Sequence, residues 1–183
     1  MNKFDCFESE RLLYRGISEQ DADSLVKWRS EGDLIRYFKN PEPLTLKGHM
    51  EWFNNFYLYD DSRFDFVIME KASHSGTSEH ARKGIRLRKS VDSKIGTVGV
   101  NVLDYHKKSC EISYMIAEIG ARRKGYGSEA VLALICRLKQ EGICHFYTEI
   151  HGDNLASIRT SEKLGFLQYS QQGDFLLFGK DET

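Results

Sequence analysis

The sequence predicts a single mixed α/β domain, for three reasons. The chain has 183 residues, which suits one compact domain spanning 1–183. Strand-like and helix-like segments follow in the order strand, two helices, three strands, helix, strand, helix and two strands. This order is irregular, whereas a doubly wound parallel fold repeats βαβ units. Hydrophobic residues make up 40% of the chain, and it has only two prolines, which supports a packed core.

The first 70 residues predict two strands with two helices between them. Residues 10–17 have strand character, and Ser18 offers an N-cap for a helix over 19–30. Both prolines then break the chain, and Thr45 starts a second amphipathic helix. Residues 64–69 are mostly apolar and predict a buried strand.

The rest of the chain predicts five more strands and two more helices. Two β-rich runs joined by a short polar connection indicate a hairpin, and a glycine follows each helical segment. The expected elements are strands over 95–105 and 110–117, a helix over 126–140, a strand over 144–150, a helix over 154–164, and strands over 166–170 and 174–179. Together the segments predict a mixed central sheet of about 6–7 strands flanked by about four helices.

Residues 71–94 interrupt this pattern as a basic insertion. The chain has a net charge of -1, but residues 71–94 carry a net of +5 and residues 1–70 a net of -5. Small, polar and cationic residues predict an exposed loop or hairpin here. Its densest part, 82–89, could contact coenzyme phosphates, an anionic sugar nucleotide or RNA, or could simply be solvated. The near-neutral total gives no general reason to expect nucleic acid or an anionic membrane as a partner.

The cysteines and histidines predict neither a disulfide framework nor a metal site. The four cysteines form no CxxC pair and no Cys/His spacing typical of zinc, and the six histidines show no ligand spacing. The N-terminus is too acidic for a signal peptide, and no run approaches the roughly 18 apolar residues that a membrane span needs. We therefore expect a metal-free, soluble, cytoplasmic protein.

A basic loop with glycines separates a predicted strand from the long helix after it. Glycines let the backbone approach a ligand closely, and free N–H groups at a helix N-terminus bind phosphate oxygens. Cations just before the helix add charge-assisted contacts. The loop is Arg122-Arg123-Lys124-Gly125-Tyr126-Gly127. It predicts either a site for a polyanion, pyrophosphate included, or an ordinary glycine-softened connection.

A dinucleotide-binding loop is the rival interpretation. Gly125 to Ala130 satisfies G-x-G-x-x-A, and Glu149 ends the next strand, where a ribose-binding acid belongs. However, the glycines stand behind a basic stretch and not directly after the strand. Only 33 residues follow position 150, too few for the remaining strands of a doubly wound sheet. We reject this interpretation.

Two motifs together resemble the GCN5-related N-acetyltransferase (GNAT) superfamily. R-R-K-G-Y-G at 122–127 matches its Q/R-x-x-G-x-G/A pyrophosphate loop. N-L-A-S…E-K-L-G-F at 154–166 resembles the ending of its ribosomal-protein N-acetyltransferase-like branch, as do E-R-L at 10–12 and W-R at 28–29. The resemblance covers nearly the whole chain except 71–94.

This resemblance implies an acetyl-CoA-dependent N-acetyltransferase that acts on a primary amine by direct attack on the thioester. It implies a GNAT-like domain in which two splayed central strands hold the cofactor. The pyrophosphate would bind the basic loop, and the pantetheine arm would pair with strand backbone. The implied cofactor-binding residues are Met115, Ile116, Arg122, Arg123, Lys124, Gly125, Tyr126, Gly127, Ser128, Asn154 and Ser157.

Two residues are candidates for catalysis. An amine with a pKa near 10.4 is neutral in only about one molecule in 2,500 at pH 7, so attack needs a base. Glu111 stands on the strand that leads to the loop; it is either that base or a solvent-facing residue paired with Lys107 or Lys108. Ser161 stands where similar enzymes often have a tyrosine that protonates the thiolate. Ser161 is either the general acid or an ordinary helix residue, in which case Ser157, Tyr147 or solvent would supply the proton.

The early helices are expected to recognise the acceptor. The candidate residues are Trp28, Arg29, Tyr37 and Trp52. The acidic excess of residues 1–70 suits a cationic acceptor, and a weak resemblance to enzymes for nucleotide-linked amino sugars competes with peptide N-termini and polyamines. The alternative function is a catalytically weak acyl-CoA-binding sensor or scaffold. The sequence leaves a homodimer open.

Overall fold

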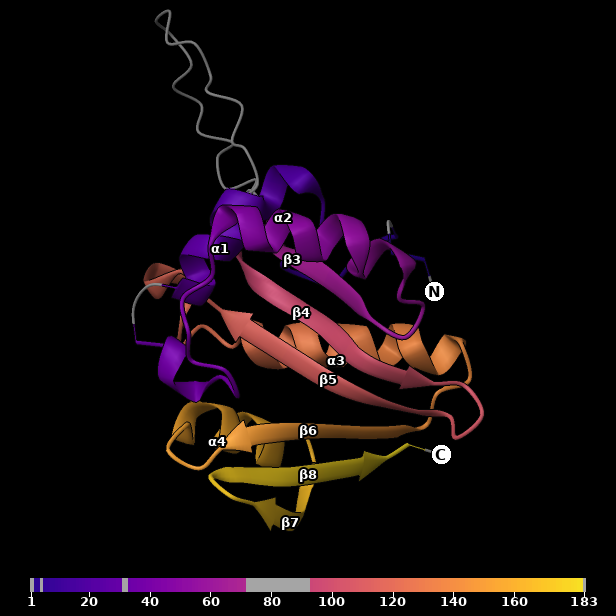
Figure 1. The fold of residues 1–183 in the computed structure, drawn as a ribbon. Helices are drawn as coiled ribbons and strands as arrows, with labels where there is room; N and C mark the ends of the chain where they lie inside the picture. Colours follow the sequence, from indigo (N-terminus) through magenta and orange to yellow (C-terminus); the bar gives the residue numbers. More distant parts are fainter. Residues whose placement is uncertain (1, 4, 31–32, 72–92, 183) are drawn as a thin grey trace, which may run out of the picture.

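An eight-stranded mixed sheet forms the centre of the computed structural model, which describes residues 2–3, 5–30, 33–71 and 93–182 (Figure 1). The strands are β1 (Cys6–Glu8), β2 (Leu12–Gly16), β3 (Phe64–Glu70), β4 (Ser93–Asp104), β5 (Ser109–Ile116), β6 (His145–His151), β7 (Leu167–Gln172) and β8 (Phe175–Asp181). Their spatial order is β1-β2-β3-β4-β5-β6-β8-β7. Every neighbouring pair is antiparallel except β5 and β6, so the rejection of a doubly wound dinucleotide fold is confirmed.

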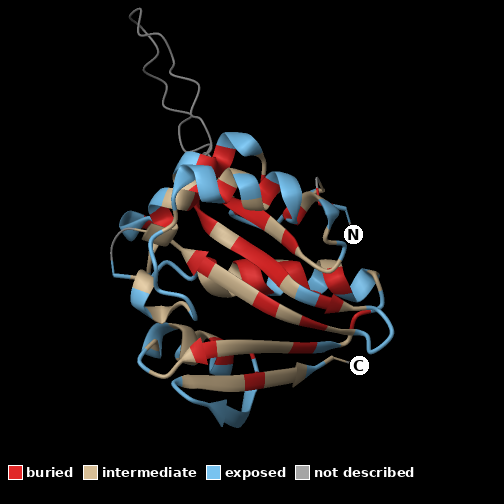
Figure 2. Cartoon of the chain, in the orientation of Figure 1, coloured by how far each residue is buried: buried red, intermediate tan, exposed pale blue. Residues whose placement is uncertain are grey.

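Helices cover the two faces of the sheet. The α-helices are α1 (Ala22–Ser30), α2 (Leu46–Asn55), α3 (Tyr126–Gln140) and α4 (Leu155–Lys163), and short 3₁₀ turns are η1 (Glu19–Asp21), η2 (Ile35–Tyr37), η3 (Tyr57–Tyr59) and η4 (Ile119–Ala121). The larger buried cluster packs α3 against β2 to β6, and a smaller one packs α1, α2 and η3 against Val67 and Met115 on the other face. Figure 2 shows the resulting buried stripes on the central strands.

The predicted mixed α/β domain with four α-helices is confirmed, but the sheet has eight strands, not 6–7. The extra strand is β1, which spans only three residues and is paired on one side, to β2. A strand so short and so little buried leaves no periodic pattern to read. The first helix also begins differently: the 3₁₀ turn η1 fills 19–21, and α1 starts at Ala22.

The basic insertion lies almost entirely outside the described residues. These exclude 72–92, and with them the run 82–89 and the expected hairpin. Lys71 and Lys94, at its two ends, are described, and each forms an ion pair with an acid of the N-terminal segment. In the parts of the chain that the structure describes, no helix is long and apolar enough to cross a membrane.

Among the described strands one pair is parallel, β5 and β6, and it separates after three residue pairs. Ser109 to Glu111 lie beside His145 to Tyr147, and beyond these residues the two strands pair no further. On their outer sides both strands remain paired, β5 with β4 and β6 with β8. The sheet is therefore continuous at one end and splayed at the other, as the resemblance implied.

A buried carboxylate ties the start of α1 to the sheet. Asp21 is fully buried and accepts hydrogen bonds from both Nη atoms of Arg15 at 2.9 Å and from Lys94 Nζ at 2.6 Å. Ser18 donates its N–H and its hydroxyl to the same carboxylate. Burial alone would raise the pKa of Asp21, but these hydrogen bonds outweigh burial and hold the pKa below its ordinary value.

We predict that Asp21→Asn destabilises the fold by about 3 kcal/mol, because it leaves two cations beside a neutral amide. Urea unfolding at pH 7 measures this. Because the folded-state pKa is depressed, the stabilisation is present above the unfolded pKa of about 3.9 and is lost as the pH falls below it. Asp23→Asn, at an exposed position in the first turn of α1, should change stability by less than about 0.5 kcal/mol. Equal effects of the two substitutions would contradict the role of Asp21.

Candidate functional site

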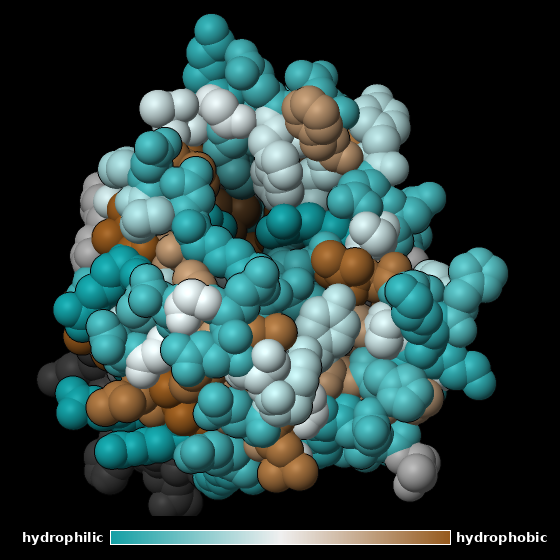
Figure 3. Space-filling model, turned by 60° about the horizontal axis from the view of Figure 1, so that its bottom comes forward, coloured by the Kyte–Doolittle hydropathy of each residue, from teal (hydrophilic) through white to brown (hydrophobic). Residues whose placement is uncertain are grey.

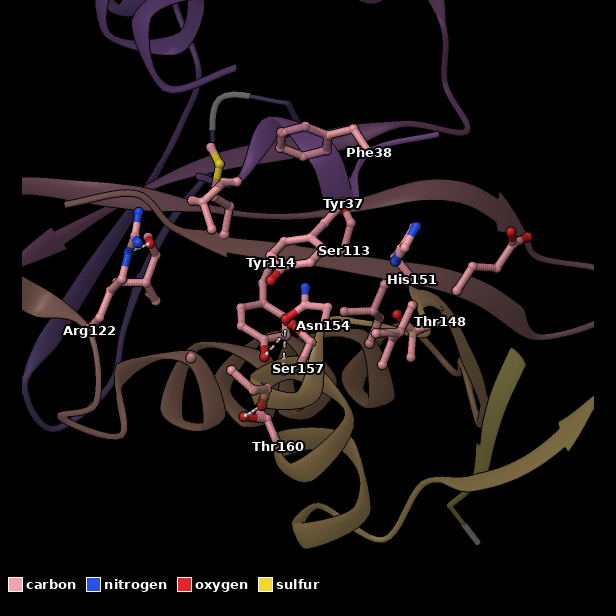
Figure 4. Close-up of a pocket in the computed structure, with 18 of the residues that line it drawn as sticks. Tyr37, Phe38, Ser113, Tyr114, Arg122, Thr148, His151, Asn154, Ser157 and Thr160 are labelled. Atoms are coloured by element: carbon pink, nitrogen blue, oxygen red, sulfur yellow. Dashed lines mark hydrogen bonds between the residues drawn. The ribbon is translucent and has the colours of Figure 1, made fainter. Parts of the chain in front are cut away.

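A cavity of about 1290 Å³ opens where β5 and β6 separate. Its walls come from β4, β5 and β6, from the start of α3 and of α4, from Arg29 and from the segment 33–40. Figure 3 shows the surface hollowed, with apolar residues inside and hydrophilic residues around the opening. Figure 4 shows side chains from β5, β6, the start of α4 and the segment with Tyr37 and Phe38 gathered around this opening. The splay therefore creates a cleft between segments that are far apart in the sequence.

The loop before α3 has the geometry of an anion-binding turn. Arg123 and Gly125 both have left-handed backbones, with φ of 62° and 82°. The first intrahelical donor of α3 is Glu129, so the N–H groups of Tyr126, Gly127 and Ser128 have no helical partner. These three residues and Arg123 line the cleft. Consecutive free N–H groups at a helix N-terminus favour phosphate oxygens.

Gly127 is required by close packing. A Cβ at this position would lie 2.7 Å from Cε2 of Tyr114, which is closer than a methyl group tolerates. The glycine therefore lets the Tyr114 ring on β5 pack directly against the first turn of α3. The spacing of the motif reflects this contact as well as the approach of a ligand.

Arg11 fastens the loop from outside the cleft. Its Nη1 donates to the carbonyl of Lys124 at 2.9 Å, its guanidinium pairs with Glu129 at 2.7 Å, and it lies 4.5 Å from the ring centre of Tyr126. Tyr126 in turn donates its hydroxyl to Glu70. The Lys124 side chain does not line the cleft; its Nζ lies 5.8 Å from the centre of the Tyr126 ring.

Arg122 holds the other end of the loop. Its Nε donates to the carbonyl of Ile116 at 3.0 Å, its Nη2 to that of Ala117 at 2.9 Å, and its Nη1 to Asp33 at 2.9 Å. The guanidinium, labelled in Figure 4, is thus occupied by the protein itself. Arg122 reaches the cleft, but its hydrogen bonds fix the end of β5 and not a ligand.

The open edge of β5 presents unpaired backbone groups. Ala117 donates its N–H to Ile95 at 2.8 Å, and antiparallel pairing alternates along a strand. The backbone of Met115 therefore points to β4, whereas the N–H groups of Tyr114 and Ile116 point to the opening. Of the two backbone positions expected to meet the cofactor, the geometry favours Ile116. Met115 contributes its side chain to the cleft wall instead.

Asn154 and Ser157 meet at the start of α4. The Asn154 Oδ1 accepts the N–H of Ser157 at 3.2 Å and caps the helix, which leaves its Nδ2 available as a donor. The hydroxyls of Ser157 and Tyr114 are hydrogen-bonded at 3.3 Å, as drawn in Figure 4. All three side chains line the cleft. Sequence reasoning did not single out the Tyr114 side chain, because a strand tyrosine carries no motif.

Ser161 is not brought to the cleft. Its side chain is 4% exposed on the buried side of α4, and it is absent from the cavity lining. The neighbouring Thr160 does line the cavity, but its hydroxyl donates to the carbonyl of Ala156. The helical turn that points Thr160 outward turns Ser161 into the core.

Glu111 stands at the vertex of the splay and lines the cleft. Its Oε1 accepts a hydrogen bond from Asn101 Nδ2 at 2.8 Å, while Ser113 donates to the Oδ1 of the same asparagine. Lys107 pairs with Asp104 at 3.4 Å and not with Glu111. Burial, followed by the nearby Glu111 charge, raises the pKa of Tyr147 on β6. Glu111 is thus a positioned carboxylate beside the place where the strands part.

Two of the four residues expected to recognise the acceptor line the cleft, and two do not. Arg29 and Tyr37 line the cleft, and the Tyr37 ring lies 5.9 Å from that of His151 across the opening. Trp28 is 7% exposed and donates its Nε1 to Glu118 at 2.8 Å, and Trp52 packs on Tyr57; neither lines the cavity. Both tryptophans support the cleft wall from behind.

Several cleft residues carry no sequence signal. Lys39 pairs with Glu149 at 2.5 Å and so joins the segment after η2 to β6. Arg63, from the turn before β3, lines the same cavity. Among the described residues, no group of three or more His, Cys, Asp or Glu side chains is placed to hold a metal ion. Only the folded chain brings these residues together.

Comparison with known proteins identifies the family. Residues 11–167 match the acetyltransferase (GNAT) domain. The chain belongs to the GNAT acetyltransferase family. It is 26% identical over 165 residues to YoaA, an uncharacterized N-acetyltransferase of Bacillus subtilis, covering 89% of this chain and 83% of YoaA. It is also 26% identical over 160 residues to an uncharacterized protein of Methanocaldococcus jannaschii; the match covers 87% of this chain and spans 28% of that protein's length.

Solved structures share the GNAT fold. A domain from Methanocaldococcus jannaschii superposes with a TM-score of 0.75 at 22% identity, covering 97% of this chain and 100% of that one. RimL, a ribosomal L7/L12 α-N-protein acetyltransferase solved with coenzyme A, gives 0.74 at 15% identity over 97% and 98%. Spermidine N-acetyltransferase of Vibrio cholerae, solved with coenzyme A and spermine, gives 0.75 at 15% identity over 93% and 95%. At these identities the likeness concerns the fold.

In this GNAT domain, the left-handed turn before α3 gives a direct test of the loop geometry. We predict that Gly125→Ala destabilises the fold by about 1–2 kcal/mol, because a side chain at φ of 82° is strained. Gly120→Ala, in η4 of the same segment, meets nothing within 4 Å and should change stability by less than about 0.5 kcal/mol. Urea unfolding compares the two. A neutral Gly125→Ala would mean that the turn is not held in this conformation.

Proposed function

We propose that the chain is an acetyl-CoA-dependent N-acetyltransferase that acetylates a primary amine by direct attack on the thioester. The observation that carries the proposal is the position of Glu111 at the vertex of the splayed strands, in one cleft with the anion-binding turn. Membership of the GNAT acetyltransferase family supports the acyl transfer. Two structures with this fold, RimL and the spermidine acetyltransferase, were solved with coenzyme A. A cytoplasmic setting fits the four unpaired cysteines.

The cleft suits the parts of coenzyme A in order. The N–H groups of Tyr126 to Ser128 would hold the pyrophosphate, and Arg123 would add charge beside it. The open backbone of Tyr114 and Ile116 would pair with the amides of the pantetheine arm, and the free Nδ2 of Asn154 would donate to it. Acetyl-CoA supplies the activated acetyl thioester.

The residues at the vertex then supply the proton transfer. Glu111 takes a proton from the acceptor ammonium, directly or through a water molecule, and Asn101 holds the carboxylate in place. The amine nitrogen bonds to the thioester carbon, the carbon–sulfur bond breaks, and the nitrogen loses its second proton to solvent. The N–H of Ile116 donates to the carbonyl oxygen as that oxygen gains negative charge. The products are an acetamide and a thiolate.

The thiolate needs no contribution from Ser161, which lies outside the cleft lining. Thiols ionise near a pKa of about 8.5, so a thiolate leaves readily. The hydroxyl pair of Tyr114 and Ser157 is the group placed to return a proton. We therefore assign the general acid, where one is used, to this pair.

A catalytically weak acyl-CoA-binding sensor is the second candidate, and the buried Ser161 favours it. Release of the free thiol from acetyl-CoA with a panel of amines separates the two functions. The panel needs a peptide N-terminus, a polyamine and a nucleotide-linked amino sugar. Binding of acetyl-CoA without turnover of any amine would exclude the enzyme and leave the sensor.

We predict that Glu111→Gln lowers kcat roughly 10²-fold, because the amide cannot accept the amine proton. Calorimetric titration should show unchanged affinity for coenzyme A. The control is Glu162→Gln, an exposed carboxylate on α4, which should keep wild-type activity. A near-wild-type rate for Glu111→Gln would refute its role as the base.

A further inference from the structure

A pair of arginines lines the cleft on the sheet face that α1 and α2 cover. Arg29 comes from the last turn of α1, and Arg63 from the turn before β3. The proposed chemistry gives neither a role. The sequence suggested a cationic acceptor, from the acidic excess of residues 1–70. The part of the cleft lining that comes from these residues does not share this acidic excess, since it has three cations and one carboxylate: Arg29, Lys39, Arg63 and Asp33.

Arg29 forms no ion pair with any described residue, and Asp65, an acid whose charge acts on it, is already paired with Arg63. The Nε of Arg29 is buried without a hydrogen-bond partner in the described parts of the chain. The Arg29 guanidinium carbon lies over the Phe38 ring, 4.1 Å from the ring centre. Burial, and then the like charge of Arg63, lowers the pKa of Arg29. Arg29 is half-buried, and a partly desolvated cation without an ion-pair partner costs free energy that a bound anion can recover.

The acids nearby are already engaged. Asp65 is paired with Arg63 at 2.8 Å, Asp33 with Arg122 at 2.9 Å, and Glu149 with Lys39 at 2.5 Å. His49 adds no negative charge, and burial, followed by Arg29, lowers its pKa. The pair Arg29 and Arg63 with Asp65 therefore leaves one positive charge facing the cleft.

Arg63 is held in position. Lys3 donates to the carbonyls of Asp60 and Arg63 at 2.5 and 2.6 Å and so fixes the turn. The Arg63 guanidinium lies 5.2 Å from the centre of the Trp52 ring. An arginine fixed by its backbone and an aromatic ring presents its remaining N–H groups with little further loss of entropy.

Arg63 lies far from the anion-binding turn. Its ion-pair partner Asp65, on β3, lies beside Gly99 on β4, and Gly99 lies beside Ser113 on β5. The turn follows Ala117, four residues farther along, which is about 13 Å at about 3.3 Å per residue. Coenzyme phosphates bound at the turn would not reach Arg63. Arg63 lies instead at the level of Glu111, where the acceptor amine must arrive, and its charge acts on the neighbouring Arg29.

We propose that the acceptor carries an oxyanion, a phosphate or a carboxylate, and that Arg29 and Arg63 bind it while the amine meets Glu111. This inference rests on the proposed function. A guanidinium donates two parallel hydrogen bonds to either oxyanion, so one site accommodates both. Arg29 supplies the unpaired fork, and Arg63 adds its remaining donors. The acceptor is thus an amino sugar phosphate or nucleotide-linked amino sugar, or an amino acid or peptide carboxylate.

The test compares amines that differ only in the anion. One pair is glucosamine and glucosamine 6-phosphate, and the other is a short peptide with a free or an amidated C-terminus. We expect the anionic member of one pair to have a kcat/KM at least about 10-fold higher, and the pair that shows it identifies the source of the oxyanion. A preference for the neutral members, or for spermidine, would overturn the proposal.

Substitution of Arg29 tests whether this residue causes the preference for the anionic amine. Arg29→Gln should lower kcat/KM for the preferred anionic amine about 10–100-fold and leave that of its neutral counterpart within about 2-fold. The control is Lys27→Gln, an exposed cation on the same helix, which should change neither. Equal losses for both amines of a pair would mean that Arg29 only supports the fold, and would refute the proposal.

Equilibrium binding measurements test the oxyanion site independently of the proposed acetyltransferase activity. Calorimetric titration of each amine into the protein saturated with coenzyme A needs no turnover. Tighter binding of the anionic amine, lost in Arg29→Gln, supports the oxyanion site even if no amine is acetylated, in which case only the enzymatic function fails. If neutral amines are acetylated and the anionic amines show no higher kcat/KM and no tighter binding, the oxyanion site is refuted while the acetyltransferase activity stands.

Discussion

The early end of the pairing between β5 and β6 is the constraint on which the site depends. Three residue pairs join the strands, and after Glu111 and Tyr147 their facing backbone groups have no strand partner. Unpaired N–H and C=O groups inside a domain are costly unless a ligand or water completes them. The outer partners β4 and β8 hold the strands in register, so the opening cannot close by slipping.

The fastening of the loop before α3 follows from this opening. Because β5 has no neighbour on one side, its end must be held by other means. Arg122 does so through the carbonyls of Ile116 and Ala117, and Arg11 holds the far side of the loop at Lys124. The free N–H groups at the start of α3 are thereby fixed in position before any ligand binds. Preorganised donors of this kind bind an anion without further reorganisation.

The fold and the cofactor half of the cleft were largely predictable from the sequence. Strand and helix periodicity placed seven of the eight strands, since each spans at least five residues with a pattern to read. The glycines of the loop carry local backbone information, which is why the motif points to the turn at Gly125. The eighth strand, β1, is too short to leave such a signal.

The acceptor half was not predictable to the same extent. Trp28 and Trp52 are aromatic residues of a type often found in binding sites. In this fold their large apolar surfaces pack into the core behind the cleft wall. Arg63, Tyr114 and Glu149 join the site only through sheet register. Ser161 aligns with a catalytic position, but the helical period turns it into the core. Charge summed over 70 residues likewise said little about the few charges that face the cleft.

Titration of coenzyme A into the ¹⁵N-labelled protein, followed through the backbone amide resonances, shows whether the cofactor binds in the opening between β5 and β6. If it does, the largest shifts fall on Tyr114 and Ile116 and on residues 123–128. Met115, whose N–H points to β4, should move less than its two neighbours. Shifts concentrated outside the opening between β5 and β6, or saturation without change at these amides, would contradict this binding site.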